Sequence, residues 1–249
     1  MSGPNNAGNP TGVYGRAGGA PVRVEASPAE IGRGIRARWR WRLGAEPTRA
    51  TLLQRILAAR GLADEAATLA FLEPRLSALH DPSLIPDLDR AAERLLAAIC
   101  RGEQIAIYGD YDVDGVTATA ILWHMIRAIE PGAKVRSYVP HRLEEGYGLN
   151  VEAIRALAAE GAGLIVSVDC GVTATEPAEA ARACGADLII TDHHNPPKTL
   201  DELPRAYAVV HPCRPDSAYP FPHLCGAGVA YKLAWRLATL AEGNGGRAS

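Results

Sequence analysis

Short apolar runs alternate with helical stretches over most of this chain, a pattern typical of α/β proteins. Runs rich in β-branched residues predict strands at 104–108, 134–139, 163–168, 187–191 and 207–210. Apolar residues at helical spacing predict helices around them, at 88–101, 116–129, 151–160, 176–184 and after Gly228. We therefore expect a mostly parallel five-stranded sheet with helices on both faces.

The first hundred residues follow a different pattern. Gly, Asn, Pro and Ser dominate the first 34 or so residues without apolar periodicity, which predicts a disordered leader. Two short helical patterns, 52–59 and 64–71, predict a small helical leader before the sheet. The expected domains are a disordered leader, a helical amino-terminal extension, an α/β domain and a flexible tail, at 1–34, 35–100, 101–241 and 242–249.

Three of the predicted strands end in clusters of side chains that bind metals. These side chains are, in chain order, Asp110, Asp112, Asp114, Asp169, Asp192, His193 and His194. Parallel sheets of this class place their sites at the carboxyl ends of the strands, so we expect the clusters to converge. Because so many unpaired carboxylates would repel one another, a bound cation is the favoured explanation.

The ligand types indicate Mg²⁺ or Mn²⁺, because carboxylates dominate and no thiolate has metal spacing. Asp110, Asp112 and Asp114 alternate, so in an extended segment they would share one face. One carboxylate can bridge two ions, and such pairs direct the attack of water on phosphoesters. The alternative, a polar Asp/Gly turn, explains one cluster more easily than three.

The motifs also resemble those of a known family. Residues 110–115, 168–171 and 191–194 read Asp-Tyr-Asp-Val-Asp-Gly, Val-Asp-Cys-Gly and Thr-Asp-His-His. This order resembles the DHH phosphoesterase superfamily. Within it, the segments 141–150, 215–221 and 225–233, together with a leader from about Trp39, are similar to the RecJ family of single-strand-specific exonucleases.

The resemblance implies roles for the clustered residues. Asp112 and Asp169 would hold one ion, and Asp114, Asp169 and His193 would hold the other. Asp110 would bind an ion directly or lie just behind the ligands. His194 would face the scissile phosphate, and Asp192 would orient an imidazole from the second layer around the metals.

The resemblance also implies a bacterial hydrolase that removes nucleotides from single-stranded DNA in the 5′ to 3′ direction. Its cofactors would be two Mn²⁺ or Mg²⁺ ions, and its role would be in recombination and repair, alongside other DNA-repair proteins. The manganese pyrophosphatases of the superfamily carry a His where this chain has Tyr108, which argues against that activity.

RecJ proteins carry a fourth acidic motif and a second, DNA-gripping domain, and neither is found before Ser249. We therefore expect an amino-terminal piece of a larger nuclease. Two alternatives stay open: an incomplete site that binds metal or nucleic acid weakly, and a phosphodiesterase acting on short oligonucleotides or cyclic dinucleotides.

Composition adds limits to these expectations. The chain has 249 residues, 47% of them hydrophobic and 22% charged, and no segment resembles a secretory signal or a membrane span. Five cysteines without a Cys-x-x-Cys pair indicate reduced thiols in the cytoplasm. The lack of a run of transmembrane length predicts no membrane partner. A zinc site at His211, Cys213, His223 and Cys225 fits no common spacing.

The formal net charge of −2 is unusual for a DNA-binding protein. The most regular basic pattern consists of four arginines alternating with apolar residues, at Arg36, Arg38, Arg40 and Arg42. This period of two predicts a strand. A solvated outer face over buried tryptophans is a simpler interpretation of it than a stripe that binds the DNA backbone.

Overall fold

The computed structural model describes residues 32–33, 38–39, 51–141, 146 and 148–243. It divides into two compact units: the first ends at Ala78 and the second begins at Leu79. Most of the predicted disordered leader (1–34), of the alternating arginine segment and of the predicted tail lies outside the described residues. No helix in the described part of the chain is both long and apolar enough to span a membrane.

The first unit contains two short helices, α1 (Leu52–Ala59) and α2 (Glu65–Leu72), as the sequence predicts. A capping box begins α1, because the Thr51 hydroxyl accepts from the Gln54 amide and the Gln54 side chain accepts from the Thr51 amide. The 3₁₀ turn η1 (Leu76–Ala78) follows α2. Two-residue strands, β1 (Gly32–Arg33) and β2 (Arg38–Trp39), pair in antiparallel fashion before α1.

The second unit is built on a five-stranded sheet whose neighbouring strands all pair in parallel. The spatial order is β4 (Val135–Tyr138), β3 (Gln104–Tyr108), β5 (Ala162–Val168), β6 (Asp187–Thr191) and β7 (Ala208–Val210). The prediction of a mostly parallel five-stranded sheet is confirmed.

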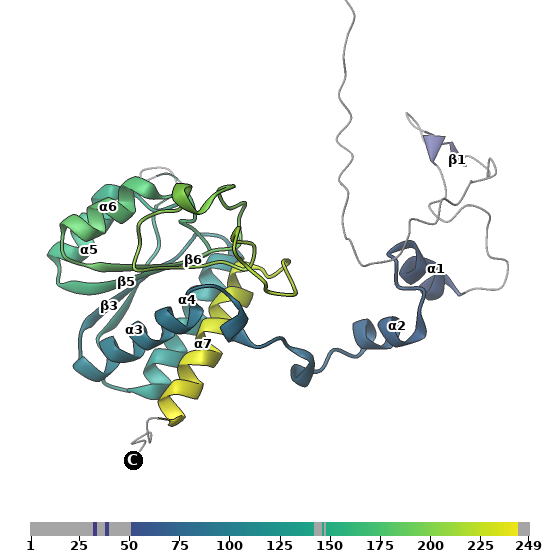
Figure 1. Cartoon of the computed structure of the whole chain (residues 1–249), viewed down its shortest axis with the longest axis horizontal. Coiled ribbons are helices and arrows are strands. Elements are labelled where there is room, and N and C mark those ends of the chain that lie inside the picture. Colours follow the sequence, from purple (N-terminus) through teal and green to yellow (C-terminus); the bar gives the residue numbers. More distant parts are fainter. Residues whose placement is uncertain (1–31, 34–37, 40–50, 142–145, 147, 244–249) are drawn as a thin grey trace, which may run out of the picture. The chain divides into compact units, whose positions relative to one another are not determined.

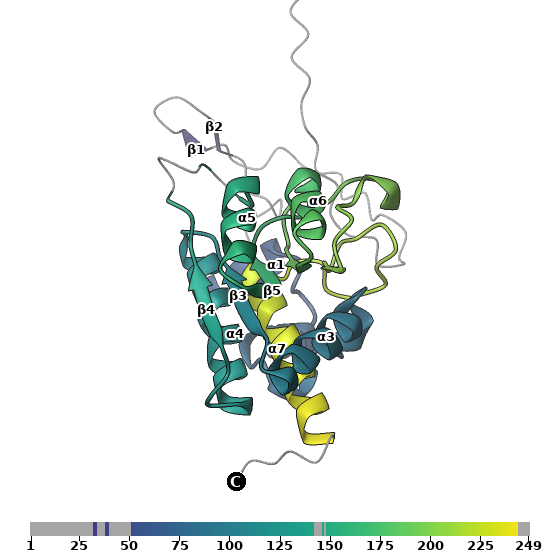
Figure 2. The same ribbon diagram turned by 90° about the vertical axis from the view of Figure 1, so that its left-hand side faces the viewer.

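Helices cover both faces of this sheet, as expected (Figure 1, Figure 2). One face packs on α3 (Leu88–Arg101), α4 (Val113–Ile129) and α7 (Gly226–Gly243), around side chains such as Ile107 and Val166. The other face packs on α5 (Val151–Ala159) and α6 (Thr175–Ala183), around Ile165 and Ile190. Successive strand residues point to opposite faces of the sheet. Because helices cover both faces, both sets of strand residues are buried and apolar.

Helix α3 belongs to the core of the second unit, although the predicted domain boundary at residue 100 puts it with the amino-terminal helices. Leu88, Leu95 and other residues of α3 are fully buried in the same cluster as α7 and the sheet. The compact unit correspondingly begins at Leu79, just before the 3₁₀ turn η2 (Pro82–Leu84). The domain boundaries derived from the sequence stay predictions.

Strand β7 lies at the edge of the described sheet, and its outward peptide groups are covered by an ion pair. The Val209 amide donates to Asp87 Oδ2 (3.1 Å), and the Val209 carbonyl accepts from Arg214 Nη1 (2.9 Å). Arg214 also binds Asp87 (2.6 Å) and Asp216 (2.7 Å). This network fixes the position of β7 and of the loop that follows it.

Candidate metal centre

The first acidic cluster lies in the turn between β3 and α4. Asp110 is 2% exposed, and Asp112 caps α4 by accepting at Oδ1 from the amides of Asp114 (2.9 Å) and Gly115 (3.0 Å). The helix therefore begins at Val113, three residues earlier than predicted. The expectation that the three aspartates share one face of an extended segment is wrong, because Asp114 lies in the first helical turn.

Gly115 allows this turn to fold tightly. A β-carbon at position 115 would lie 2.6 Å from Asp110 Cβ and 2.7 Å from the Asp110 amide nitrogen. Rotating a side chain could not relieve this overlap, because two of the nearest atoms belong to the Asp110 backbone. Glycine here brings the start of α4 against Asp110 and so holds Asp110 and Asp112 near each other.

Asp169 follows β5 and lies at the centre of the site. It is 1% exposed and has a φ of 62°, a left-handed conformation that few residues other than glycine adopt. Its Oδ1 accepts no hydrogen bond of good geometry from the residues that the structure describes. Burial, followed by the charges of Asp114 and Asp112, raises the pKa of Asp169 to about 7.

The third cluster forms a loop after β6 that is organised by Asp192. The Asp192 Oδ1 accepts from the His193 amide (2.7 Å) and the His194 amide (3.0 Å), and it lies 2.7 Å from His194 Nδ1. Its Oδ2 accepts from the Val172 amide (2.9 Å). The structure thus places Asp192 behind His194, as expected of a carboxylate that orients an imidazole. We call 192–194 the histidine loop.

The hydrogen bond to Asp192 also affects the charge of His194. Burial alone would lower the pKa of His194, but the Asp192 bond and the charges of Asp192 and Asp169 raise it above its ordinary value. When Nδ1 carries the proton that Asp192 accepts, the Nε2 lone pair is available to a cation. This is the usual arrangement of a histidine ligand with a carboxylate behind it.

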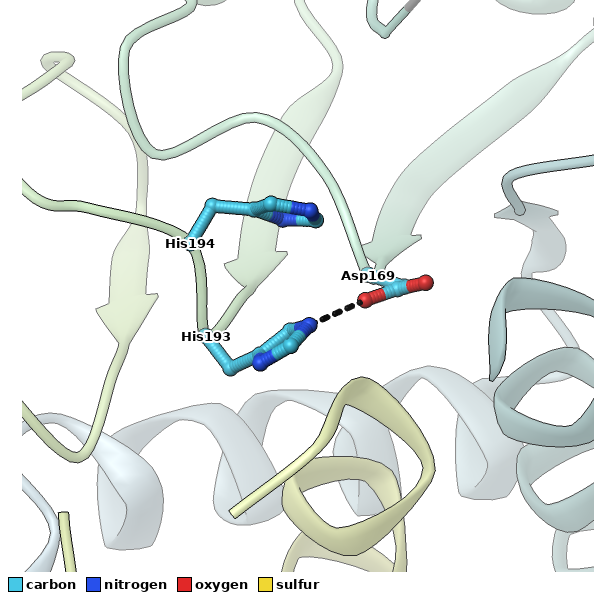
Figure 3. Close-up of side chains that lie close together, drawn as sticks. All are labelled: Asp169, His193 and His194. Carbon is cyan, nitrogen blue, oxygen red and sulfur yellow. Dashed lines mark ion pairs between the residues drawn. The ribbon is translucent and has the colours of Figure 1, made fainter. Parts of the chain in front are cut away.

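The histidine loop and Asp169 meet at the carboxyl edge of the sheet (Figure 3). His193 Nε2 lies 3.1 Å from Asp169 Oδ1, and the His193 and His194 rings are 4.6 Å apart. His193 Nε2 is also 3.5 Å from Asp114 Oδ2. Although His193 Nε2 lies close to Asp169 Oδ1, the two do not form a hydrogen bond, and this oxygen has no hydrogen-bond partner among the described residues.

Asp114 also binds the start of α7. The Gly226 amide donates to Asp114 Oδ2 and the Ala227 amide donates to Oδ1, both at 2.7 Å. Burial opposes ionisation of this carboxyl, but these two bonds, together with the Cys225 side chain and the charge of His193, lower the pKa of Asp114 below its ordinary value. A carboxylate oxygen can accept such a bond and still contact a cation, since it carries two lone pairs.

Two sets of residues at this edge bring one ligand atom each to within 4.8 Å of one another. One set is Asp110, Asp112 and Asp169, and the other is Asp169, His193 and His194. Asp169 belongs to both sets. The arrangement therefore suits two adjacent cations with a shared carboxylate, the geometry that supports hydrolysis of phosphoesters.

Two features of this region were missed by the sequence reasoning. His211, at the carboxyl end of β7, is fully buried, and its Nε2 lies 2.7 Å from the His194 carbonyl oxygen. The rule that sites gather at strand ends would have included it, but it was considered only as a zinc ligand. The contact of Gly226 and Ala227 with Asp114 had no sequence signal, because it depends on where α7 packs.

Comparisons with known proteins agree with this geometry. The family model described as the DHH family, N-terminal domain, matches residues 104–246, more than half of the chain. The chain belongs to the DHH family. The segment 141–150, which suggested the relationship, lies partly outside the described residues, but the acidic clusters and the histidine loop of this DHH domain are all described.

Among its relatives in the DHH family are exonucleases that act on single-stranded DNA. The single-stranded-DNA-specific exonuclease RecJ of Bacillus subtilis is 41% identical over 186 residues, which cover 75% of this chain and 23% of that protein. RecJ of Thermus thermophilus is 38% identical over 213 residues, covering 82% and 30%. The chain thus spans about a quarter to a third of the length of these relatives.

Solved structures show the same fold. A crystal structure of exonuclease RecJ bound to manganese has a TM-score of 0.54 at 40% identity, covering 63% of this chain and 38% of that one. RecJ of Thermus thermophilus in complex with Mn²⁺ has a TM-score of 0.56 at 33% identity, covering 76% and 24%. The predicted kinship with RecJ is confirmed.

Proposed function

We propose that this chain carries the metal-binding part of a phosphodiesterase that removes nucleotides from single-stranded DNA in the 5′ to 3′ direction. The observation that carries the proposal is Asp169 Oδ1, a buried carboxylate oxygen without a hydrogen bond that two sets of ligands share. Relatives named as single-stranded-DNA-specific exonucleases support the choice of substrate. The relatives are much longer than this chain, so the activity belongs to the proposal.

The residues present fit two divalent cations. A carboxyl whose pKa is raised to about 7 by burial and by neighbouring carboxylates is destabilised as an anion, and a cation would relieve that cost. We propose Asp112 and Asp169 for one ion, with Asp110 beside them, and Asp114, Asp169 and His193 for the other. Two RecJ structures that contain manganese make Mn²⁺ or Mg²⁺ the expected ions.

The residues of the chain would then divide the work as follows. Bound cations would supply an activated water and stabilise the charge that develops on the phosphate. Asp192 holds His194 so that its Nε2 points away from Asp192 and is available to the phosphate or to a cation. Asp114 ties the start of α7 to the site, where the partial positive charge of the helix favours anionic groups.

Substrate digestion and metal binding together test the proposal. Because the chain spans only about a quarter to a third of the length of its relatives, we expect it to digest DNA poorly even in excess over a 5′-phosphorylated oligonucleotide and with Mn²⁺. Any nucleotides released should come from the 5′ end of single strands and not from a blunt duplex. EDTA should stop the reaction, and calorimetry should find two Mn²⁺ per chain. Binding of no Mn²⁺ would refute the metal centre, and hydrolysis of a cyclic dinucleotide with none of DNA would favour the second phosphodiesterase class.

The cellular setting is part of the same proposal. A role in recombination and repair, a cytoplasmic location and contacts with other DNA-repair proteins follow from the resemblance to RecJ. The relatives named as single-stranded-DNA-specific exonucleases support the first of these, because single strands arise during such processes. Loss of resistance to DNA damage after deletion of the gene, restored by the wild-type gene but not by an Asp169→Asn version, would be the expected genetic result.

A further inference from the structure

His211 is a buried histidine whose two ring nitrogens both bind backbone groups. It lies at the end of β7, fully buried. The Cys213 amide donates to Nδ1 at 2.9 Å, and Nε2 lies 2.7 Å from the carbonyl oxygen of His194. Both contacts are to backbone groups, so His211 holds two separate stretches of backbone, at His194 and at Cys213, in place.

The partners determine which nitrogen carries the proton. The Cys213 amide can only donate, so Nδ1 must be the acceptor and must lack a proton. The His194 carbonyl can only accept, so Nε2 must carry the proton and donate. The ring therefore satisfies one backbone donor and one backbone acceptor at once, which a carboxylate or an ammonium group could not do.

The histidine loop is consequently held from two sides. Asp192 binds the amides of His193 and His194 and the His194 ring on one side. His211 binds the carbonyl of His194 on the other side. Without this second contact, the His194 carbonyl would lose a part-buried hydrogen bond just before Pro196, which has no amide proton to offer in its place.

Strand β7, which positions His211, is held in place by several hydrogen bonds. The Val209 peptide group is bound on both sides by Asp87 and Arg214, and the Asp192 amide donates to the Val210 carbonyl (3.2 Å). Beyond His211, the Cys213 thiol donates to the Pro222 carbonyl (3.0 Å), in the segment that leads to α7. His211 thus joins the histidine loop to a part of the fold that other bonds already fix.

We propose that His211 is a positioning residue of the metal centre. By donating from Nε2 to the His194 carbonyl, it keeps His193 and His194 within reach of Asp169. The inference rests on the proposed metal-dependent function. It differs from a purely structural role, in which His211 would only fill space in the core and any stable replacement would serve equally well.

Three variants separate the two roles. His211→Leu fills space but offers no donor, His211→Gln offers an amide N–H near the position of Nε2, and Val210→Ala removes a neighbouring buried side chain while leaving the backbone bonds in place. Mn²⁺ affinity is measured by calorimetry on the full chain, and stability is measured by thermal unfolding without metal.

We expect His211→Leu to weaken Mn²⁺ binding by about 10- to 100-fold, the range found when groups behind metal ligands are changed. His211→Gln should recover most of that affinity. Val210→Ala should lower the unfolding temperature and leave Mn²⁺ affinity close to that of the parent chain. Equal affinity in His211→Leu and the parent, or equal losses in all three variants, would overturn the proposal.

A measurement without metal keeps this inference separate from the proposed function. In the ¹⁵N spectrum of the metal-free parent, His194 should show a protected Nδ1–H bound to Asp192. We expect this signal to be lost in His211→Leu and kept in Val210→Ala. If the parent binds no Mn²⁺ the metal centre is refuted, yet retention of the signal in His211→Leu would still decide against the positioning role.

Discussion

Among single residues, Asp169 combines three unusual properties. Its φ is left-handed, its side chain is buried, and one of its oxygens lacks a hydrogen bond. Each property is costly in an ordinary fold, and together they are the properties expected of the shared metal ligand that we propose. The sequence indicated that Asp169 was a ligand, but its backbone conformation could not be inferred from the residues around it.

The left-handed conformation decides which substitution of Asp169 is informative. Asp169→Asn should lower Mn²⁺ affinity by more than about 100-fold. Changes to groups behind a ligand cost about 10- to 100-fold, and a change to the proposed shared ligand itself should cost more. The fold should persist, because Asn tolerates this φ well. Asp169→Ala should lose affinity similarly and cost about 1 kcal/mol more in unfolding free energy. Calorimetry with Mn²⁺ and urea unfolding would measure both, and nearly unchanged affinity in Asp169→Asn would contradict the shared-ligand assignment.

The raised pKa of Asp169 predicts how the stability of the metal-free chain depends on pH. The folded pKa of about 7 exceeds the unfolded value, so the folded state binds more protons between the two values. The stabilisation by the protonated acid is therefore complete below about pH 4, the unfolded pKa, and is lost as pH rises through 7.

Urea unfolding of the metal-free chain from pH 5 to pH 8 tests this expectation. Asp169 should lower the unfolding free energy of the parent across this range. The raised pKa of His194 and the lowered pKa of His211 act in the same range with opposite signs, and the lowered pKa of Asp114 acts in more acidic solution, so the effect of Asp169 is read from the difference between the parent and Asp169→Asn. Asp169→Asn cannot ionise, so its curve should be flatter, and its stability relative to the parent should rise with pH. Parallel curves for the two proteins would show that Asp169 ionises normally.

At the scale of elements, the site depends on how closely the start of α7 approaches it. A β-carbon on Gly226 would overlap the Asp169 carboxylate, whereas one on Gly228 would contact the Leu224 side chain at 3.3 Å and Cys225 Sγ at 3.8 Å. The strands, and the gathering of acidic and histidine side chains at their carboxyl ends, were predictable from apolar runs and from the rule for parallel sheets. The α7 contact was not, because it depends on packing between helices far apart in sequence.

Gly226→Ala and Gly228→Ala form a matched pair for this contact. Gly226→Ala should destabilise the chain by about 1–3 kcal/mol through overpacking, and should weaken Mn²⁺ binding by displacing Asp169 or α7. Gly228→Ala lies in the same turn, where Ala favours the helix, and should be close to neutral. Unfolding and Mn²⁺ titration of both variants measure the difference, and similar behaviour would mean that α7 can move without affecting the site.

At the scale of the molecule, all the candidate ligands belong to the second unit. The compact unit from Leu79 onward contains the sheet, its helices, the histidine loop and the start of α7. The predicted five-stranded sheet and its helical leader were recovered, with most boundaries within three residues, because apolar periodicity reports on strands and helices directly. The assignment of α3 to the sheet unit required knowing what its buried face contacts.

Removal of the first unit tests this division. Residues 79–249 alone should bind Mn²⁺ with the affinity of the whole chain and should keep its main unfolding transition, since the ligands and their supports are retained. The control is the same shortened chain with Asp169→Asn, which should fold without binding Mn²⁺ tightly. A large loss of Mn²⁺ affinity on removing residues 1–78 would show that the first unit supports the centre.

The hydrogen bonds from Gly226 and Ala227 to Asp114 connect residues more than a hundred positions apart. On the ribosome, Asp114 is therefore synthesised long before these partners, and the contact that holds it forms only when α7 emerges and docks. Early acquisition of metal by the nascent chain would involve a looser set of ligands with little selectivity. In the proposed metal centre, this order of synthesis would delay the fixing of Asp114 until the strands of the sheet have been made.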